Sequence, residues 1–217
     1  MINKKCFEYL IYALIVLVIL INGIIVKDNA IAVVSAFFGI LYTIYAGKGK
    51  VLCYYFGIIS STTYCYLAFS QFLWGNVFLY LLYYIPMQFI GIFKWKKNLK
   101  QTKNEIIKIR LKNKERLFLL IICFVLMMIA IYFLNLNNDK SPYLDGIVTV
   151  CSIFGMYLTV RRAIEQWFFW GIVNFLSCLM WIILIIQGAK NYSTALMWFI
   201  YFVLGIYFYF QWKKELN

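Results

Sequence analysis

Long apolar stretches, separated by short polar or glycine-containing breaks, follow one another along almost the whole chain. A transmembrane helix requires about 20 consecutive, mostly apolar residues, with a range of about 17–25. Eight stretches meet this requirement: 7–26, 30–46, 51–70, 75–95, 117–134, 143–160, 167–186 and 194–212. The pattern predicts an all-α integral membrane protein with eight transmembrane helices.

Composition supports the membrane assignment. Of the 217 residues, 65% are hydrophobic and the mean hydropathy is +0.81, whereas soluble domains contain about 45–50% apolar residues. Because the chain has only two prolines and no linker-like segment, we predict one transmembrane domain over residues 1–217. The first stretch is too long for the apolar core of a signal peptide and lacks an A-x-A cleavage site, so we interpret it as a retained helix.

Basic residues indicate the orientation, because cytoplasmic loops are enriched in lysine and arginine. With a cytoplasmic N-terminus, 18 of the 21 basic residues lie on the cytoplasmic side, and only Lys27, Lys140 and Lys190 lie outside. We therefore predict that both termini are cytoplasmic. The basic run 94–116 could indicate nucleic-acid binding, but a cytoplasmic loop that obeys the positive-inside rule explains it better, and such a loop can lie on anionic lipid. We expect no nucleic-acid partner.

The two halves of the chain resemble each other. Residues 54–60 ("YYFGIIS") match 168–174 ("FFWGIVN"), and two further pairs occur in the same order: 35–43 with 151–159, and 93–97 with 209–214. We predict two parallel three-helix repeats, related by an axis along the membrane normal as in some transporters. The predicted parts are an extra N-terminal helix (1–29), a first repeat (30–97), a basic loop with a connector helix (98–142) and a second repeat (143–214).

The stretch that begins at Trp167 carries unusual polar chemistry for a membrane helix. Trp167, Trp170 and Asn174 are spaced by three and four residues, so they share one helix face. An intramembrane polar side chain faces the bundle interior or a cavity, although asparagine also forms hydrogen bonds between packed helices. The two tryptophans on the same face favour a cavity. The matching positions of the first half are Cys53, Phe56 and Ser60, so the second half would supply the stacking surface.

The stretch 75–95 runs in the opposite direction and carries a second polar stripe. Pro86 should kink this helix or free local backbone groups. Gln88 lies as many residues from Trp95 as Asn174 lies from Trp167, which places the two amides at matched depth, facing each other across a cavity. The members of the stripe are Asn76, Tyr80, Tyr84, Gln88, Gly91 and Trp95.

The last stretch carries a third, mainly aromatic stripe that ends at Trp212. Such a stripe serves packing more often than binding, but Trp198 and Tyr201 remain candidates for the cavity. Trp95 and Trp212 end their helices at the predicted cytoplasmic side, which makes them gate or interface candidates.

The residues that are missing also bear on function. The chain contains no histidine, its six cysteines are scattered, and all eight carboxylates lie in loops or near helix ends. We therefore predict no metal site, no cofactor, no catalytic residues and no enzyme activity. Ion-coupled transport commonly uses intramembrane ionisable groups, so passive movement is favoured. Indole, phenol and amide groups together suit a flat, cationic ring that bears a sugar.

Two segments resemble the signature regions of the PnuC vitamin transporters: "YIPMQFIGIFKWKKN" (84–98) and "RRAIEQWFFWGIVNFLSCLMWI" (161–182). The W-x-x-W-x-x-x-N pattern is the more specific part, and Phe93 and Phe169 depart from the family's pattern. The resemblance implies a fold like that of SWEET sugar transporters, a homotrimer, and a bacterial inner or plasma membrane location. It also implies facilitated diffusion of nicotinamide riboside, trapped by cytosolic phosphorylation, with Trp167, Trp170, Asn174 and Gln88 forming the binding site.

Two other interpretations remain open from the sequence. The same machinery could carry thiamine, which is also a flat cation, or another vitamin or nucleoside. Alternatively, the chain could be a membrane subunit without a small ligand, because aromatic stripes can serve packing alone.

Overall fold

The computed structural model describes the backbone of residues 4–100, 104–136 and 142–217, and the side chains of these residues except 4–7 and 9. The predictions that concern Lys103, Asp139 and Lys140 lie outside the described residues. The helices are α1 (Lys4–Ile25), α2 (Ala30–Gly47), α3 (Cys53–Ser70), α4 (Trp74–Leu79), the π-helical turn η1 (Tyr80–Tyr84), α5 (Ile85–Lys96), α6 (Asn113–Leu136), α7 (Pro142–Val160), α8 (Gln166–Ile186) and α9 (Tyr192–Leu216).

Each predicted stretch coincides with a helix or, for 75–95, with the continuous run α4–η1–α5. Six of these are long and apolar enough to cross a membrane by length and composition: α2, α4–η1–α5, α6, α7, α8 and α9. In α1 the apolar part covers Leu10–Ile25, and α3 is less apolar because hydroxyl and tyrosine side chains interrupt it. The prediction of an all-α, multi-pass membrane protein is thereby confirmed.

Pro86 changes the helix that contains it. A proline inside an α-helix clashes with the carbonyl of the residue four positions earlier. In this chain the π-helical turn Tyr80–Tyr84 ends two residues before Pro86, and the Ile85 N–H bonds to the Tyr80 carbonyl. The wider turn accommodates the proline without ending the helix. Such turns often occur at functional sites, and this one alters the direction in which the residues before it point.

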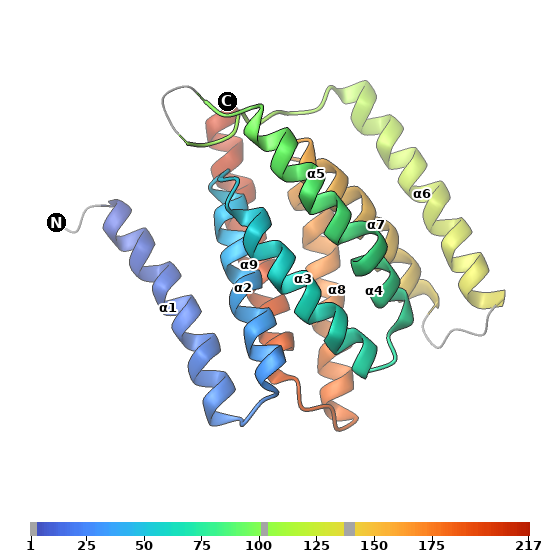
Figure 1. The fold of residues 1–217 in the computed structure, drawn as a ribbon. Helices are drawn as coiled ribbons and strands as arrows, with labels where there is room; N and C mark the ends of the chain where they lie inside the picture. Colours follow the sequence, from blue (N-terminus) through green and yellow to red (C-terminus); the bar gives the residue numbers. More distant parts are fainter. Residues whose placement is uncertain (1–3, 101–103, 137–141) are drawn as a thin grey trace.

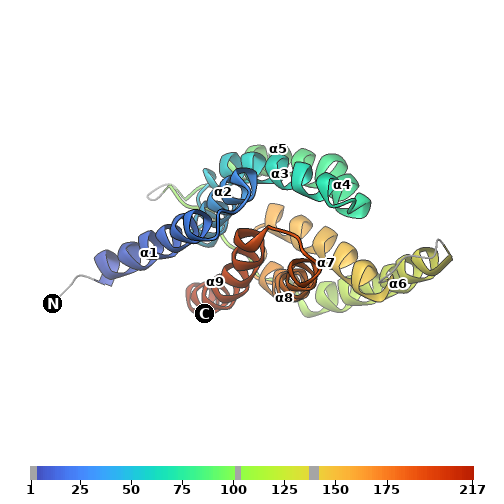
Figure 2. The same cartoon turned by 90° about the horizontal axis from the view of Figure 1, so that it is seen from below.

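The helices form two layers, one made by α1 to α5 and the other by α6 to α9 (Figure 2). Within the layers, α2 packs on α3 and α8 packs on α7 and α9. The layers meet where α2 contacts α9 and α5 contacts α7. Many large apolar side chains point outward, as expected of helices in lipid. In α6, for example, Cys123 is the one buried residue among those described.

The segment 104–112 packs across one end of the bundle, near the end of α9 (Figure 1). We call this end of the bundle, which carries the segment 104–112 and the end of α9, the basic end. The Ile106 side chain is fully buried, and its N–H donates to the Gly49 carbonyl at 2.8 Å. Ile109 pairs with the α7–α8 connection through bonds to the Arg162 carbonyl and from the Ile164 N–H, each 3.0 Å. This part of the predicted cytoplasmic loop 94–116 therefore packs against the bundle, because Ile106 and Leu111 have a core to enter.

Lys108 is buried within the same segment. Its ammonium lies 2.6 Å from the Glu215 carboxylate and 4.9 Å from the centre of the Trp212 ring. Burial lowers the pKa of Lys108 from its ordinary value, and the hydrogen bond to Glu215 opposes this shift. The buried charge thus depends on its partner to remain protonated at low cost.

Candidate functional site

An internal cavity lies between the two layers. The cavity volume is about 70 Å³, and the wider space between the lining atoms, including any part open to solvent, is about 670 Å³. Helices α2, α3 and α5 and the turn η1 form one side, and α7, α8 and α9 form the other. The lining residues are Tyr42, Thr43, Ala46, Gly57, Ser60, Ser61, Tyr80, Tyr84, Gln88, Met156, Gln166, Trp167, Trp170, Asn174, Trp198 and Tyr201.

One wall comes from α8, where helical spacing aligns Trp167, Trp170 and Asn174. The Trp170 indole N–H donates to the Thr159 hydroxyl at 2.9 Å, and that hydroxyl donates to the Gly155 carbonyl at 2.8 Å. These two bonds fix the orientation of the Trp170 ring. Asn174 is only 4% exposed, so any partner for its amide must come from within the cavity or from neighbouring helices.

Gln88 of α5 lines the opposite side of the cavity and is also only 4% exposed. Its Nε2 donates to the Ser61 hydroxyl at 2.6 Å, whereas its Oε1 is buried and has no hydrogen-bond partner among the described residues. A buried acceptor without a partner costs about 1–3 kcal/mol. Gly57 makes space for this amide, because a Cβ at that position would come within 3.1 Å of Gln88 Oε1. This arrangement leaves an acceptor for a ligand.

Aromatic rings form most of the remaining wall. Tyr84 lies with its ring centre 6.0 Å from that of Trp170 and 4.6 Å from that of Tyr80. On α9, Trp198 lies 5.4 Å from Tyr201. The tyrosine hydroxyl of Tyr201 occupies space against Gly39, where any side chain would overlap it. The cavity is thus lined on several sides by ring faces and edges.

Two indole N–H groups add unused donors. Trp167 Nε1 and Trp198 Nε1 are buried and lack partners among the described residues. Trp167 stacks on Phe208 with ring centres 5.6 Å apart and planes at 29°. Because α8 and α9 run in opposite directions, these two tryptophans lie towards opposite ends of the cavity. No residue that lines the cavity carries a formal charge, so its polarity comes from amides, hydroxyls and indoles.

Comparison with known proteins identifies the family. The sequence profile of the family described as "Nicotinamide mononucleotide transporter" matches residues 29–214. The chain is 33% identical to the nicotinamide riboside transporter PnuC of Neisseria mucosa, over 86% of this chain and 73% of that protein. It is 30% identical to the protein of the same name from Haemophilus influenzae, over 97% and 91%. This chain belongs to the PnuC family of membrane transporters.

A solved structure of the family has the same fold. The crystal structure of the vitamin B3 transporter PnuC superposes with a TM-score of 0.87 at 30% identity, covering 96% of this chain and 91% of that one. The family assignment is therefore consistent at the level of sequence and of fold.

The structure brings most of the predicted site residues of this PnuC-family chain to one cavity. Eight of the nine predicted contacts line it: Gln88, Tyr80, Tyr84, Trp167, Trp170, Asn174, Trp198 and Tyr201. The exception is Asn76, which is half-buried in the first turn of α4 and does not line the cavity. Asn76 lies one regular turn before Tyr80, whose N–H bonds to the Asn76 carbonyl, so the predicted stripe continues past the end of the cavity.

Trp95 and Trp212 lie inside the bundle, beside the cavity. Both are fully buried, so neither forms part of an aromatic belt that faces lipid. The Trp95 indole donates to the Thr159 carbonyl at 3.0 Å, and the Trp212 indole donates to the Gly47 carbonyl at 2.6 Å. Each therefore ties the last helix of one half to the first helix of the other half.

Sequence reasoning did not single out several lining residues, notably Tyr42, Thr43, Ser61 and Gln166. Tyr42 and Thr43 end the repeated segment 35–43, and Ser61 follows Ser60 in the middle of a membrane helix. Hydroxyl groups in the middle of apolar stretches were the available signal. Gln166 lies just before the predicted stretch 167–186, but it is the first residue of α8 and is buried.

Proposed function

We propose that this chain carries nicotinamide riboside across the membrane through the cavity between its two layers. The observation that carries the proposal is the uncharged cavity wall, which combines ring faces with an unpartnered buried acceptor and two unpartnered donors. A cationic pyridinium can stack on indole and phenol rings, a contact worth about 0.5–2 kcal/mol. A carboxamide and a ribose can use the free polar atoms.

The cavity favours a riboside over a mononucleotide. The family profile is described by the mononucleotide, whereas the relatives from Neisseria mucosa and Haemophilus influenzae are named for the riboside. Proteins hold phosphate with arginine or lysine side chains or with helix N-termini. Because no lysine or arginine lines this cavity, a phosphate dianion would enter it without compensation.

Thiamine is the second candidate, because it is also a flat cation and would stack on the same rings. The two amides favour the riboside: Gln88 can accept from a carboxamide N–H, and Asn174 can bond to its carbonyl or to the ribose. A binding panel of nicotinamide riboside, its mononucleotide, thiamine, riboflavin and thymidine, measured by titration calorimetry on the purified full-length protein, separates these candidates. We expect the riboside to bind tightest; tighter binding of the mononucleotide or thiamine would contradict the proposal.

Transport is proposed to be facilitated diffusion, with trapping of the riboside by phosphorylation in the cytosol. Among the described residues, no aspartate, glutamate, lysine, arginine or histidine lines the cavity, which supports this mechanism. Proteoliposomes should therefore equilibrate labelled riboside in a saturable manner without an ion gradient. Absence of saturable uptake would favour the alternative of a membrane subunit without a small ligand, and uptake that requires a proton or sodium gradient would contradict facilitated diffusion.

The proposed architecture is an N-terminal helix followed by two parallel three-helix repeats of the SWEET-like kind, with α6 as the connector. The two indole bonds support it, because Trp95 and Trp212 hold matching positions in the halves and each reaches the first helix of the other half. The basic end would face the cytoplasm together with both termini, in a bacterial inner or plasma membrane. We propose a homotrimer, which mass photometry of the purified protein can test.

A further inference from the structure

A second, much larger hollow lies on the outside of the bundle. This groove runs between α6 and α9 over the outer face of α8. Its walls are mainly large apolar side chains, and its rim at the basic end carries Arg110, Arg116 and Lys213. The lining residues are Arg110, Leu111, Arg116, Leu119, Leu120, Leu158, Ile164, Glu165, Trp167, Phe168, Phe169, Gly171, Ile172, Phe175, Phe202, Gly205, Ile206, Tyr209, Phe210 and Lys213.

We propose that this groove binds one anionic phospholipid of the cytoplasmic leaflet, with its acyl chains along α8 and its phosphate at the rim. The length of the groove fits one leaflet. Along α8 it extends from Glu165 to Phe175, which is about 15 Å at 1.5 Å per residue. The hydrocarbon core of a bilayer is about 30 Å thick, so the groove spans the depth of a single leaflet.

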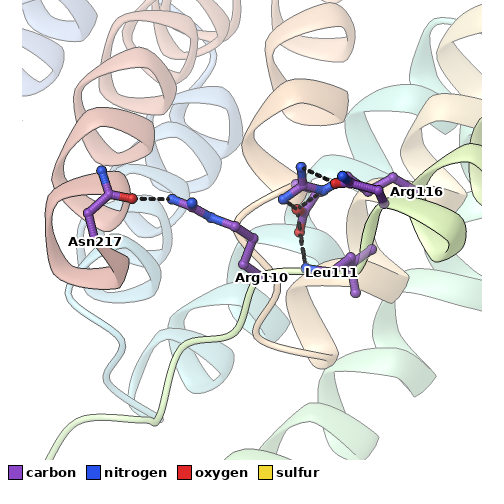
Figure 3. Close-up of polar contacts among 6 residues, drawn as sticks. Arg110, Leu111, Arg116 and Asn217 are labelled. Carbon is purple, nitrogen blue, oxygen red and sulfur yellow. Dashed lines mark hydrogen bonds and ion pairs between the residues drawn. The ribbon is translucent and has the colours of Figure 1, made fainter.

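The charges at the rim suit a phosphate. Arg116 is already occupied, because its guanidinium pairs with Glu165 at 2.7 Å, and Glu165 also accepts from the Leu111 N–H (Figure 3). Arg110 donates to the neutral Asn217 side chain at 2.9 Å (Figure 3). No described carboxylate pairs with Arg110 or Lys213. Basic pockets between helices on the cytoplasmic side are typical sites for anionic headgroups.

A second copy of the chain fits this rim less well. It would have to present carboxylates to the two free cations, but the described carboxylates of the basic end are largely used within the chain. The internal pairs are Glu8 with Lys48, Glu115 with Arg161, Glu165 with Arg116 and Glu215 with Lys108. Among the described carboxylates of this end, Glu105 alone forms no ion pair. A lipid phosphate supplies the negative charge that Arg110 and Lys213 lack within the chain.

The groove also borders the transport cavity. Trp167 lines both spaces, so a lipid in the groove would lie next to a side chain that also lines the cavity. Gly171 offers a way to fill the groove from α8, because a Cβ built there meets no atom within 4 Å. The substitution Gly171→Leu should therefore occupy lipid space without disturbing the packed interior.

Native mass spectrometry of the purified full-length protein, titrated with phosphatidylglycerol or phosphatidylcholine, tests the proposal. We expect phosphatidylglycerol to bind more tightly. The double variant Arg110→Gln/Lys213→Gln should raise its dissociation constant about 30-fold, and Gly171→Leu should lower the binding of both lipids. The matched control is Lys94→Gln/Lys96→Gln, which removes the same charge from exposed positions outside the groove and should leave lipid binding unchanged.

Two results would overturn the proposal. One is equal binding of the two lipids together with no effect of Arg110→Gln/Lys213→Gln. The other is a Gly171→Leu variant that retains lipid but loses its oligomeric state, which would assign the groove to a second copy of the chain. Neither result depends on which vitamin the cavity carries.

Discussion

The two halves of the molecule share a scaffold but differ in the walls they give to the cavity. In both halves an indole at the end of the last helix bonds to a carbonyl near the end of the other half's first helix. In both, a threonine hydroxyl bonds one turn back to a glycine carbonyl, Thr43 to Gly39 and Thr159 to Gly155. The cavity walls do not match: α8 contributes two indoles, whereas α3 contributes Gly57, Ser60 and Ser61.

We propose that the matching bonds serve the scaffold and that the unmatched cavity walls serve the ligand. The matching bonds hold helices together in each half. A bound ring needs one flat surface and free space beside it, which two identical walls of tryptophan would not leave. Small side chains on α3 provide that space, and the first half contributes its polar group from α5 through Gln88 instead.

The largest expected effect concerns the stacking surface. Trp170→Ala should weaken riboside binding about 5- to 150-fold, because stacking of a base on an aromatic side chain is worth about 1–3 kcal/mol. The matched position of the first half is Phe56, which packs on Phe38 and Tyr45 rather than lining the cavity. Phe56→Ala should leave affinity within about twofold. Similar losses for both variants, measured by calorimetry, would mean that the walls are equivalent.

The second prediction concerns the shared scaffold. Trp95→Phe and Trp212→Phe each remove one buried indole N–H and leave a backbone carbonyl without its side-chain donor, at a cost of about 1–2 kcal/mol. We expect similar decreases in apparent melting temperature for the two variants in the same detergent. A large decrease for only one of them would show that the two bonds are not equivalent. Trp95→Phe should leave riboside affinity unchanged, because Trp95 does not line the cavity.

The third and smallest effect concerns the two cavity amides, Gln88 from the first half and Asn174 from the second, which we call the polar edge. Gln88→Met and Asn174→Leu keep much of the side-chain volume and remove one amide each. Loss of a hydrogen bond of about 0.5–1.5 kcal/mol predicts roughly 2- to 12-fold weaker binding for each variant. Ser61→Ala, which frees Gln88 Nε2 from its partner, should have a smaller effect. Unchanged affinity in both amide variants would remove Gln88 and Asn174 from the site.

Helix positions were predictable from the apolar stretches. In lipid, a spanning segment must form its backbone hydrogen bonds internally, which favours long apolar helices. The ends of α6 and α9 extend further than predicted because polar residues such as Asn113 and Lys213 continue a helix into the interface. Trp167, Trp170 and Asn174 could be grouped by spacing alone, because α8 is regular between them.

The remaining features depend on tertiary context. Spacing could not reveal the π-helical turn, nor that the cavity ends before Asn76, one turn beyond Tyr80. The segment 104–112 was predicted only as part of a basic cytoplasmic loop, because charged residues dominate its composition. In the structure Ile106, Lys108 and Leu111 are buried. Their burial depends on partners that are distant in the sequence. Gly49 accepts from the Ile106 N–H, Glu165 accepts from the Leu111 N–H, and Glu215 pairs with Lys108.

The central claim is that one half supplies the stacking wall and both halves supply the polar edge. A structure of the complex with nicotinamide riboside would test this claim most directly. We predict that the pyridinium ring lies against Trp170. Gln88 Oε1 and the Asn174 amide should each lie about 2.7–3.2 Å from a polar atom of the ligand. A ligand that lies against α3 without touching Trp170, or that binds outside this cavity, would contradict the account.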